Sequence, residues 1–288
     1  MLQVPLIPGK EYYTHETAPT SFIEVGGTDY AYRSFGRSRG LPIVFLQHFG
    51  GTMDGWDPEI TNALARNHPI ILFDNKGVSS SFGKTPNNIS EMANDAIDFF
   101  TAMGIGEMYL LGFSMGGFVA QYITEKRPDL VRKLILAGTG PRGGTGISNL
   151  DAVMAEAFRL EPAEPRVFTF FEKSAGGKKA ARDFLERLKR RTVETDPPVS
   201  PETYNAQAKA IVAFGRESDV AYNQLKRIKQ PVLIFNGNND LMVPSVNSLV
   251  LVQQLPDAKL VMWSDSGHGG IFQYHQDFVN EVERFLSC

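Results

Sequence analysis

The chain has 288 residues, of which 42% are hydrophobic and 21% are charged, proportions that are ordinary for a globular protein. This apolar content is enough for a sizeable core and excludes intrinsic disorder for most of the chain. The 29 Lys and Arg against 32 Asp and Glu give a net charge of −3, which offers no electrostatic support for a nucleic-acid-binding protein.

The ends of the chain suggest its cellular setting. The first residues, MLQVPLIPGKEYYTH, lack the basic stretch and the long apolar run of a signal peptide. No uninterrupted apolar stretch approaches about 18 residues, so the sequence predicts no membrane span. The single cysteine is Cys288, which excludes an internal disulfide and a four-cysteine metal site. We therefore expect a cytoplasmic protein, and a homodimer is compatible with the sequence.

In chain order, the first predicted element is a β-hairpin formed by Ser21–Val25 and Thr28–Ser34 around a glycine turn. Six short apolar runs without polar alternation then indicate strands buried on both faces, as in a parallel sheet. They are Pro42–Gln47, Pro69–Phe73, Met108–Phe113, Val131–Ala137, Val232–Asn236 and Lys259–Trp263. The predicted helices between and after them are Glu59–Asn67, Ser90–Met103, Gly116–Arg127, Val246–Leu255 and Phe272–Leu286. This alternation predicts an α/β fold whose sheet begins with an antiparallel hairpin.

One region interrupts the alternation. Between Ala137 and Val232 lie about 90 residues without a convincing buried strand, and a structureless loop of that length is uncommon in a compact domain. The region begins with a glycine-rich stretch and continues in helical-looking pieces such as Val167–Lys173 and Asp183–Arg191. We interpret residues 141–228 as a helical cap inserted into a core that is formed by residues 1–140 and 229–288.

The pattern Gly-x-Ser-x-Gly occurs twice. Gly36–Gly40 lies between two predicted strands among charged neighbours and is interpreted as an exposed loop. Gly112–Gly116 directly follows an apolar strand and opens a predicted helix, which is the strand–turn–helix context of a nucleophile elbow. The small flanking glycines permit a tight turn there. The helix amino terminus would favour negative charge that develops beside Ser114.

A serine nucleophile requires a base and a carboxylate that orients it. Of the five histidines, His268 follows the last predicted strand, at the carboxyl end where open α/β sheets bind ligands. Asp240 follows the strand before it. Asp265 shares the loop of His268 and is interpreted as a cap of that loop. The candidate catalytic residues are therefore Ser114, Asp240 and His268, each after a different strand.

With these residues in this order, the chain resembles the α/β-hydrolase family from about Phe22 to the C-terminus, and the cap resembles it only in position and size. The resemblance implies an eight-stranded, mostly parallel sheet with helices on both faces and a helical cap after strand six. It implies that Ser114 is the nucleophile, Asp240 the acid and His268 the base. The turn at Asp74–Gly77 is similar to the family's Asp-x-Arg-Gly turn, with a lysine in place of the arginine.

The segment that should complete the oxyanion hole departs from the family pattern. The family usually has His-Gly-x after its third strand, where x donates a backbone N–H, but this chain has Gln47–Gly51 there. Aligning Trp56 with the aromatic residue that is frequent in the family makes Phe49 the donor, with Met115 as the second. The alternative alignment makes Gly50 the donor instead of Phe49.

The substrate is less sharply indicated. His48, Gly50 and Phe113 are the candidate substrate contacts, although His48 is equally well explained as a histidine bonded to the backbone. The chain has 20 phenylalanines, and several lie in the cap or near the expected pocket, which suggests an apolar acyl or aromatic group. These are Phe49, Phe113, Phe168, Phe170 and Phe171, each of which is also explained by packing alone.

Together these features predict a serine hydrolase that cleaves a carboxylic ester or related acyl bond of a small, largely apolar molecule through an acyl-enzyme. No cofactor, metal, nucleic acid or membrane partner is expected, and lactone, thioester and carbon–carbon substrates remain open. One alternative is a cofactor-free haloperoxidase or perhydrolase, a branch that commonly has proline where this chain has Gly50. The other is a ligand-binding receptor with little turnover. Ser114 argues against the aspartate nucleophile of epoxide hydrolases and haloalkane dehalogenases.

Overall fold

The computed structural model describes residues 13–161, 163–218 and 222–287. They form an eight-stranded sheet with the order β1-β2-β4-β3-β5-β6-β7-β8. β2 runs antiparallel to β1 and β4, and all other neighbours are parallel. The strands are β1 Ser21–Val25, β2 Thr28–Gly36, β3 Ile43–Leu46, β4 Pro69–Phe73, β5 Met108–Phe113, β6 Val131–Ala137, β7 Val232–Gly237 and β8 Ala258–Trp263. The predicted mostly parallel α/β sheet is confirmed.

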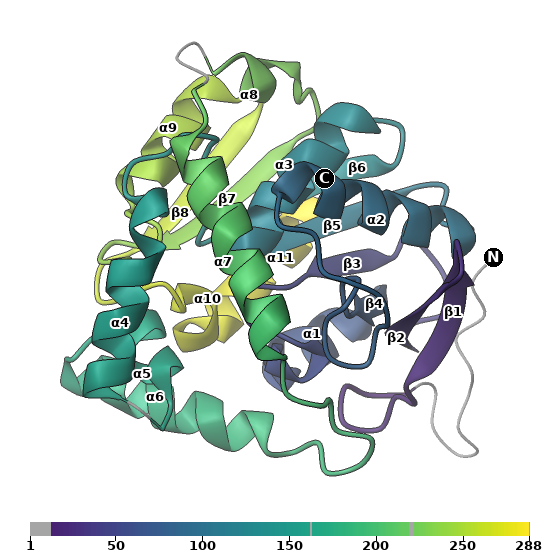
Figure 1. Cartoon of the computed structure of the whole chain (residues 1–288), viewed down its shortest axis with the longest axis horizontal. Coiled ribbons are helices and arrows are strands. Elements are labelled where there is room, and N and C mark those ends of the chain that lie inside the picture. Colours follow the sequence, from purple (N-terminus) through teal and green to yellow (C-terminus); the bar gives the residue numbers. More distant parts are fainter. Residues whose placement is uncertain (1–12, 162, 219–221, 288) are drawn as a thin grey trace.

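Helices cover both faces of this sheet (Figure 1). Buried residues of α2, α3 and α9 form one core cluster with the sheet, and those of α1 and α11 form the other. The helices outside the segment between β6 and β7 are α1 Pro58–Ala65, α2 Ile89–Ala102, α3 Met115–Lys126, α9 Val246–Gln254, α10 Gly270–Gln273 and α11 His275–Ser287, with a 3-10 turn, η1, at Met53–Gly55.

β3 and β4 are apolar at every position because both of their faces are buried. On β5, Leu110 belongs to the cluster under α2 and α3, and the next residue, Leu111, belongs to the cluster under α1 and α11. Successive strand residues point to opposite faces, so only an uninterrupted apolar run can serve both layers.

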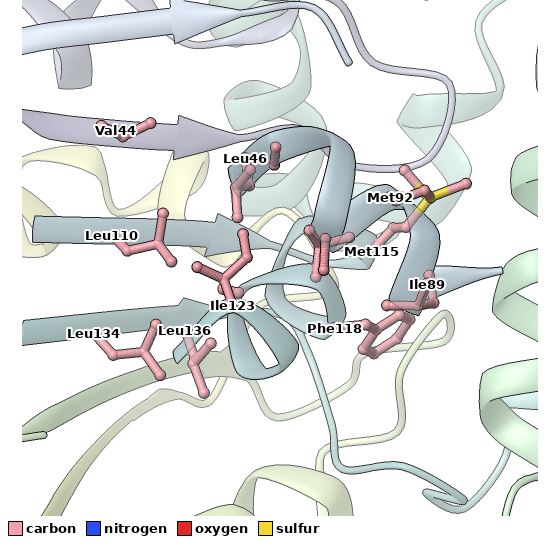
Figure 2. Close-up of a cluster of buried hydrophobic side chains, with 14 of the residues drawn as sticks. Val44, Leu46, Ile89, Met92, Leu110, Met115, Phe118, Ile123, Leu134 and Leu136 are labelled. Atoms are coloured by element: carbon pink, nitrogen blue, oxygen red, sulfur yellow. The ribbon is translucent and has the colours of Figure 1, made fainter. Parts of the chain in front are cut away.

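The first of these clusters fixes the start of α3. Figure 2 shows the side chains of Met115 and Phe118 from α3 close to those of Ile89 and Met92. Met115 is fully buried. Because its side chain is held in the core, its backbone N–H, at the first turn of α3, has a fixed position at the carboxyl end of β5.

The described part of the segment between β6 and β7 consists of helices joined by loops and contains no strand. Its elements are a 3-10 turn, η2, at Ile147–Asn149, α4 Leu150–Leu160, α5 Pro165–Phe170, α6 Ala175–Leu188, α7 Pro201–Arg216 and α8 Asn223–Arg227. In Figure 1 the green helix α7 runs across the front of the molecule, and α4, α5 and α6 lie together beside it. Phe214 of α7 stacks on Phe118 of α3 with ring centroids 4.3 Å apart, so the segment packs directly on the core.

One predicted helix is wrong in its extent. The sequence predicts a single helix over Phe272–Leu286, but α10 ends at Gln273 and α11 begins at His275. Tyr274 between them has φ −108° and ψ 38°, which are not helical values. The Tyr274 ring stacks on Trp263 of β8, a tertiary contact that hydrophobic periodicity does not reveal.

Within the described ranges, no helix has both the length and the apolar character that crossing a bilayer requires. Residues 1–12, on which most of the prediction about the amino terminus rests, and Cys288 lie outside these ranges.

Candidate active site

Ser114 lies in a strained turn between β5 and α3. Its backbone has φ 56° and ψ −119°, an unusual conformation for a residue with a side chain. The turn is so tight that a Cβ on Gly116 would lie 2.1 Å from the Leu46 carbonyl oxygen, and a Cβ on Gly112 would lie 2.4 Å from the Gly116 carbonyl oxygen. Thr139 donates its hydroxyl to the Ser114 carbonyl at 2.9 Å. The glycines and this bond hold Ser114 at the carboxyl end of the sheet.

His268 and Asp240 are brought together by the loops that follow β8 and β7. His268 Nδ1 lies 2.7 Å from Asp240 Oδ2, and both side chains are almost fully buried. The other carboxylate oxygen of Asp240 accepts the backbone N–H groups of Met242 and Val243 at 2.8 and 2.9 Å. Because a carboxylate accepts, Nδ1 carries the proton, which leaves Nε2 of a neutral ring free to accept one.

Asp265 has a different environment. Its Oδ2 accepts the hydroxyl of Ser174 at 3.1 Å, and its backbone carbonyl accepts Gln273 Nε2. These bonds link the loop after β8 to the start of α6 and to α10. The structure therefore places Asp240, and not Asp265, on the imidazole.

Ser114 and His268 both line a cavity of about 500 Å³. Its walls are mainly apolar and come from the loop after β3 and from the segment between β6 and β7. The apolar wall residues are Phe49, Met154, Phe158, Pro165, Phe170, Leu188, Pro197, Pro198, Val199, Tyr204 and Met242. The segment predicted as a cap thus supplies most of the surface that faces a bound molecule.

The charged residues of this cavity are paired. Arg166 binds Glu164 through two hydrogen bonds of 2.7 and 2.8 Å. Asp54 and Asp196 each lie 2.5 Å from a guanidinium nitrogen of Arg33, whose side chain is fully buried. Arg191 is the second cation of this group, with its Nε 3.5 Å from Asp54 Oδ1. Two arginines thus balance the two carboxylates, and the cavity presents little net charge to a ligand.

A further buried carboxyl group, that of Asp74, lies near Asp196 and Arg33. Its Oδ1 accepts the Met53 N–H at 3.1 Å. Burial, followed by the nearby charge of Asp196, raises the pKa of the Asp74 carboxyl well above its usual range. Burial likewise raises the pKa of Asp196.

The loop after β3 distinguishes the two alignments for the oxyanion donor. Gly50 donates its N–H to Gln207 Oε1 at 2.8 Å, so this N–H is already engaged. Among the described residues, none is paired as an acceptor with the N–H of Phe49 or of Met115. The geometry therefore favours Phe49 over Gly50 as the donor that remains available.

His48 lines the cavity but is held mainly by its neighbours. Its Nδ1–H donates to the Phe49 carbonyl at 2.8 Å, as expected for a histidine bonded to the backbone. Its ring contacts Phe113 and Phe170 edge-on, with centroids 5.5 and 5.4 Å apart. Burial lowers the pKa of His48 to about 3, so the ring is neutral near pH 7.

The phenylalanines singled out from the sequence have different positions. Phe49 and Phe170 line the cavity, whereas Phe168 and Phe171 line a neighbouring hollow beside Asp240. Phe113, a candidate substrate contact, is fully buried and does not line the cavity. It packs beneath the site, 4.9 Å from the His268 ring centroid, because the alternation of β5 turns it toward the core. No feature of the sequence indicates that Gln207, Tyr204 and the methionines of the cavity wall lie at the site.

Comparisons with known proteins agree with this architecture. Residues 42–273 match the family described as alpha/beta hydrolase fold. The solved structure of an alpha/beta hydrolase fold protein from Chitinophaga pinensis is 42% identical, covers 95% of this chain and 99% of its own, and superposes with a TM-score of 0.92. A Rhizobium rhizogenes protein provisionally named carbamate hydrolase RutD is 25% identical over 85% of this chain and 92% of its own. A Mycobacterium tuberculosis protein provisionally named non-heme bromoperoxidase BpoC is 24% identical over 86% and 94%.

Proposed function

The chain belongs to the α/β-hydrolase family, and from this premise we propose that it is a serine hydrolase that cleaves a carboxylic ester or related acyl bond of a small, largely apolar molecule. The observation that carries the proposal is the hydrogen bond between His268 and Asp240 at the edge of a cavity that Ser114 also lines. The strained backbone of Ser114 is a further support, because such strain is characteristic of functional turns.

The first half of the proposed mechanism is the acylation of Ser114. Ser114 Oγ attacks the carbonyl carbon while His268 Nε2 takes the hydroxyl proton, and Asp240 stabilises the imidazolium that forms. The N–H groups of Phe49 and Met115 hold the oxyanion, each contributing about 3 kcal/mol to the transition state. His268 then returns the proton to the leaving oxygen, so the alcohol departs and the acyl group stays on Ser114.

Deacylation repeats the same steps with water. His268 takes a proton from a water molecule as the water oxygen attacks the acyl carbon. The second tetrahedral intermediate collapses, the bond to Ser114 breaks, and His268 gives the proton back to the serine oxygen. A carboxylic acid is released, and no cofactor takes part.

The walls of the cavity support the apolar character of the substrate. Aromatic, aliphatic and methionine side chains form the largest group of wall residues. Among the charged wall residues, Glu164 and Arg166 pair with each other, and Asp54 and Asp196 pair with Arg33. A cavity of about 500 Å³ suits a small ligand with a few fixed polar contacts. We therefore propose an uncharged acyl group of short to medium length.

The perhydrolase alternative is disfavoured at one residue. Gly50 has φ +66°, whereas proline is restricted to about −65°. The position after Phe49 therefore cannot hold the proline that is common in that branch without rebuilding the loop. This observation favours hydrolysis over peracid formation.

The test is hydrolysis of p-nitrophenyl esters from acetate to decanoate by the wild type and by Ser114→Ala. We expect turnover with the wild type and its loss in the variant. The chain length with the highest kcat/KM would give the size of the acyl pocket. Unchanged turnover in a folded Ser114→Ala protein would reject the serine mechanism.

A further inference from the structure

The backbone around the Phe49 N–H is held by hydrogen bonds on both sides. The peptide that carries the Phe49 N–H also carries the His48 carbonyl, which accepts the Gly51 N–H at 3.0 Å. In the following peptide, the Phe49 carbonyl accepts His48 Nδ1–H, and the Gly50 N–H donates to Gln207 Oε1 at 2.8 Å. One bond therefore holds the peptide that carries the Phe49 N–H, and two hold the next peptide of the same turn.

Gln207 differs from the other two partners because it comes from another part of the chain. It lies on α7, in the segment between β6 and β7, and is 157 residues from Gly50. Its side chain is 1% exposed, and it is not among the residues that line the cavity. A substrate in the cavity therefore does not touch Gln207.

The same helix supports the loop by packing. Tyr204, one turn before Gln207, places its ring 4.2 Å from the Phe49 ring, measured between centroids. A Cβ on Gly50 would lie 3.3 Å from the Tyr204 ring. The loop is thus pressed against α7, and Gly50 is the residue that permits the close approach.

We propose that Gln207 is a positioning residue for the oxyanion hole: by accepting the Gly50 N–H, it anchors the turn from His48 to Gly51 to α7 and so keeps the Phe49 N–H, which this turn carries, directed toward the reacting carbonyl. This inference rests on the proposed function. In this proposal, α7 helps the core to fix the geometry of the oxyanion hole. The substrate-lining segment and the oxyanion hole are then connected by a single buried amide.

The physical reason lies in the freedom of Gly50. A glycine with positive φ adopts many other backbone conformations easily, so its peptide depends on hydrogen bonds to keep one orientation. Without Gln207 Oε1, the Gly50 N–H has no acceptor at a half-buried site, which favours rotation of the Phe49–Gly50 peptide. Such a rotation also removes the acceptor of His48 Nδ1–H, so the turn keeps only one of its three bonds and the Phe49 N–H that it carries is held less firmly.

Two variants of Gln207 separate its hydrogen bond from its volume. Gln207→Met keeps the length of the side chain but removes the amide oxygen, whereas Gln207→Glu keeps an acceptor oxygen. Thr203→Val is the matched control, because Thr203 is also buried on α7 and bonds the core, through the Gly77 carbonyl at 2.6 Å, away from the oxyanion loop. Melting temperatures are measured for all three.

The readout is kcat and KM on the best p-nitrophenyl ester. We expect Gln207→Met to lower kcat about tenfold, less than the loss of a whole oxyanion donor, with KM within about twofold of the wild type. Gln207→Glu should recover most of kcat. Thr203→Val should lower the melting temperature without lowering kcat. If Gln207→Met does not fold, Gln207→Asn, whose amide is too short to reach Gly50, replaces it.

A second readout uses a boronic acid, in which Ser114 Oγ bonds to boron and a boron-bound oxygen occupies the oxyanion hole. Its Ki should rise in Gln207→Met in parallel with the fall in kcat. Equal kcat and Ki in Gln207→Met and the wild type, or a change in KM alone, would overturn the inference while leaving the serine mechanism intact. If the wild type shows neither Ser114-dependent turnover nor boronate binding, the proposed function itself fails, and the inference fails with it.

Discussion

Arg187 of α6 and Asp57 at the start of α1 form a buried two-point ion pair. Arg187 Nε lies 2.9 Å from both carboxylate oxygens of Asp57, and Arg187 Nη2 lies 2.6 Å from Asp57 Oδ2. The same guanidinium donates to the Phe272 carbonyl at 3.0 Å, and Asp57 also caps α1 by accepting the Glu59 N–H. One arginine from the segment between β6 and β7 thus links it to two helices of the core.

This pair gives a prediction about stability. Arg187→Met should lower the free energy of unfolding by about 3–5 kcal/mol, because the Asp57 carboxylate stays buried without its partner. Urea denaturation measures the change. Arg159→Met, which breaks an exposed pair with Glu156, should have no measurable effect. A loss below about 1 kcal/mol in Arg187→Met would contradict the importance of the buried pair.

A second prediction concerns the carboxylate on the imidazole. Asp240→Asn should reduce kcat by about 10³–10⁴-fold with a small change in KM, because an amide favours the wrong tautomer of His268. Steady-state hydrolysis of the same ester measures it. Asp265→Asn is the matched control from the neighbouring loop and should retain kcat. Equal losses in the two variants would mean that the loop, and not the hydrogen bond of Asp240, matters.

A third prediction follows from the tight turn at Ser114. Gly116→Ala should prevent folding or remove activity, because its Cβ would lie 2.1 Å from the Leu46 carbonyl oxygen, a backbone atom that cannot easily move. Gly106→Ala is the control, since its Cβ would meet no atom within 4 Å. Soluble yield, circular dichroism and ester turnover compare them. A folded and active Gly116→Ala enzyme would disprove the predicted clash.

A fourth prediction concerns pH and His15. Burial, with the charge of Arg33 as the next cause, lowers the pKa of His15 from 6.5 to about 4 in the folded protein. Between pH 6.5 and about 4, the unfolded chain therefore binds a proton at His15 that the folded protein does not bind. The free energy of unfolding falls as the pH is lowered through this window. The contribution of His15 over this window is about 3 kcal/mol.

Comparison with His15→Gln isolates this contribution. The variant keeps a polar side chain beside the Thr61 hydroxyl, which lies 3.0 Å from His15 Nδ1, but it does not titrate. Its unfolding free energy should fall less steeply over the same pH window. His48, whose pKa is also lowered by burial, adds to the slope in both proteins. Identical slopes would show that His15 does not titrate as proposed.

The sheet could be predicted because its signals are local. Most strands of the sheet are short apolar runs, and Ser114 directly follows β5, while Asp240 and His268 lie in the loops after β7 and β8. The parallel order then brings these residues to one edge of the sheet. The hairpin is equally visible in the sequence, because two alternating segments flank the glycine pair Gly26–Gly27. In the structure both glycines have positive φ.

The contacts that the sequence did not reveal are tertiary. Gln207 is an ordinary polar residue of an amphipathic helix until its partner, the Gly50 N–H, is known. Phe113 is predicted as a substrate contact because it lies near the expected pocket, but strand alternation turns it away from the cavity. The break at Tyr274 depends on Trp263, which lies on another element.

The bond between Gly50 and Gln207 has a consequence for recombination within the fold. Exchanging the segment between β6 and β7 for that of a relative replaces the walls of the pocket, but it also removes the acceptor for Gly50 and the cation for Asp57. From the proposed role of Gln207, we expect such an exchange to change turnover and stability together with the walls of the pocket. A chimera should keep its turnover when the new segment supplies an amide at position 207, and its stability when it supplies an arginine at position 187.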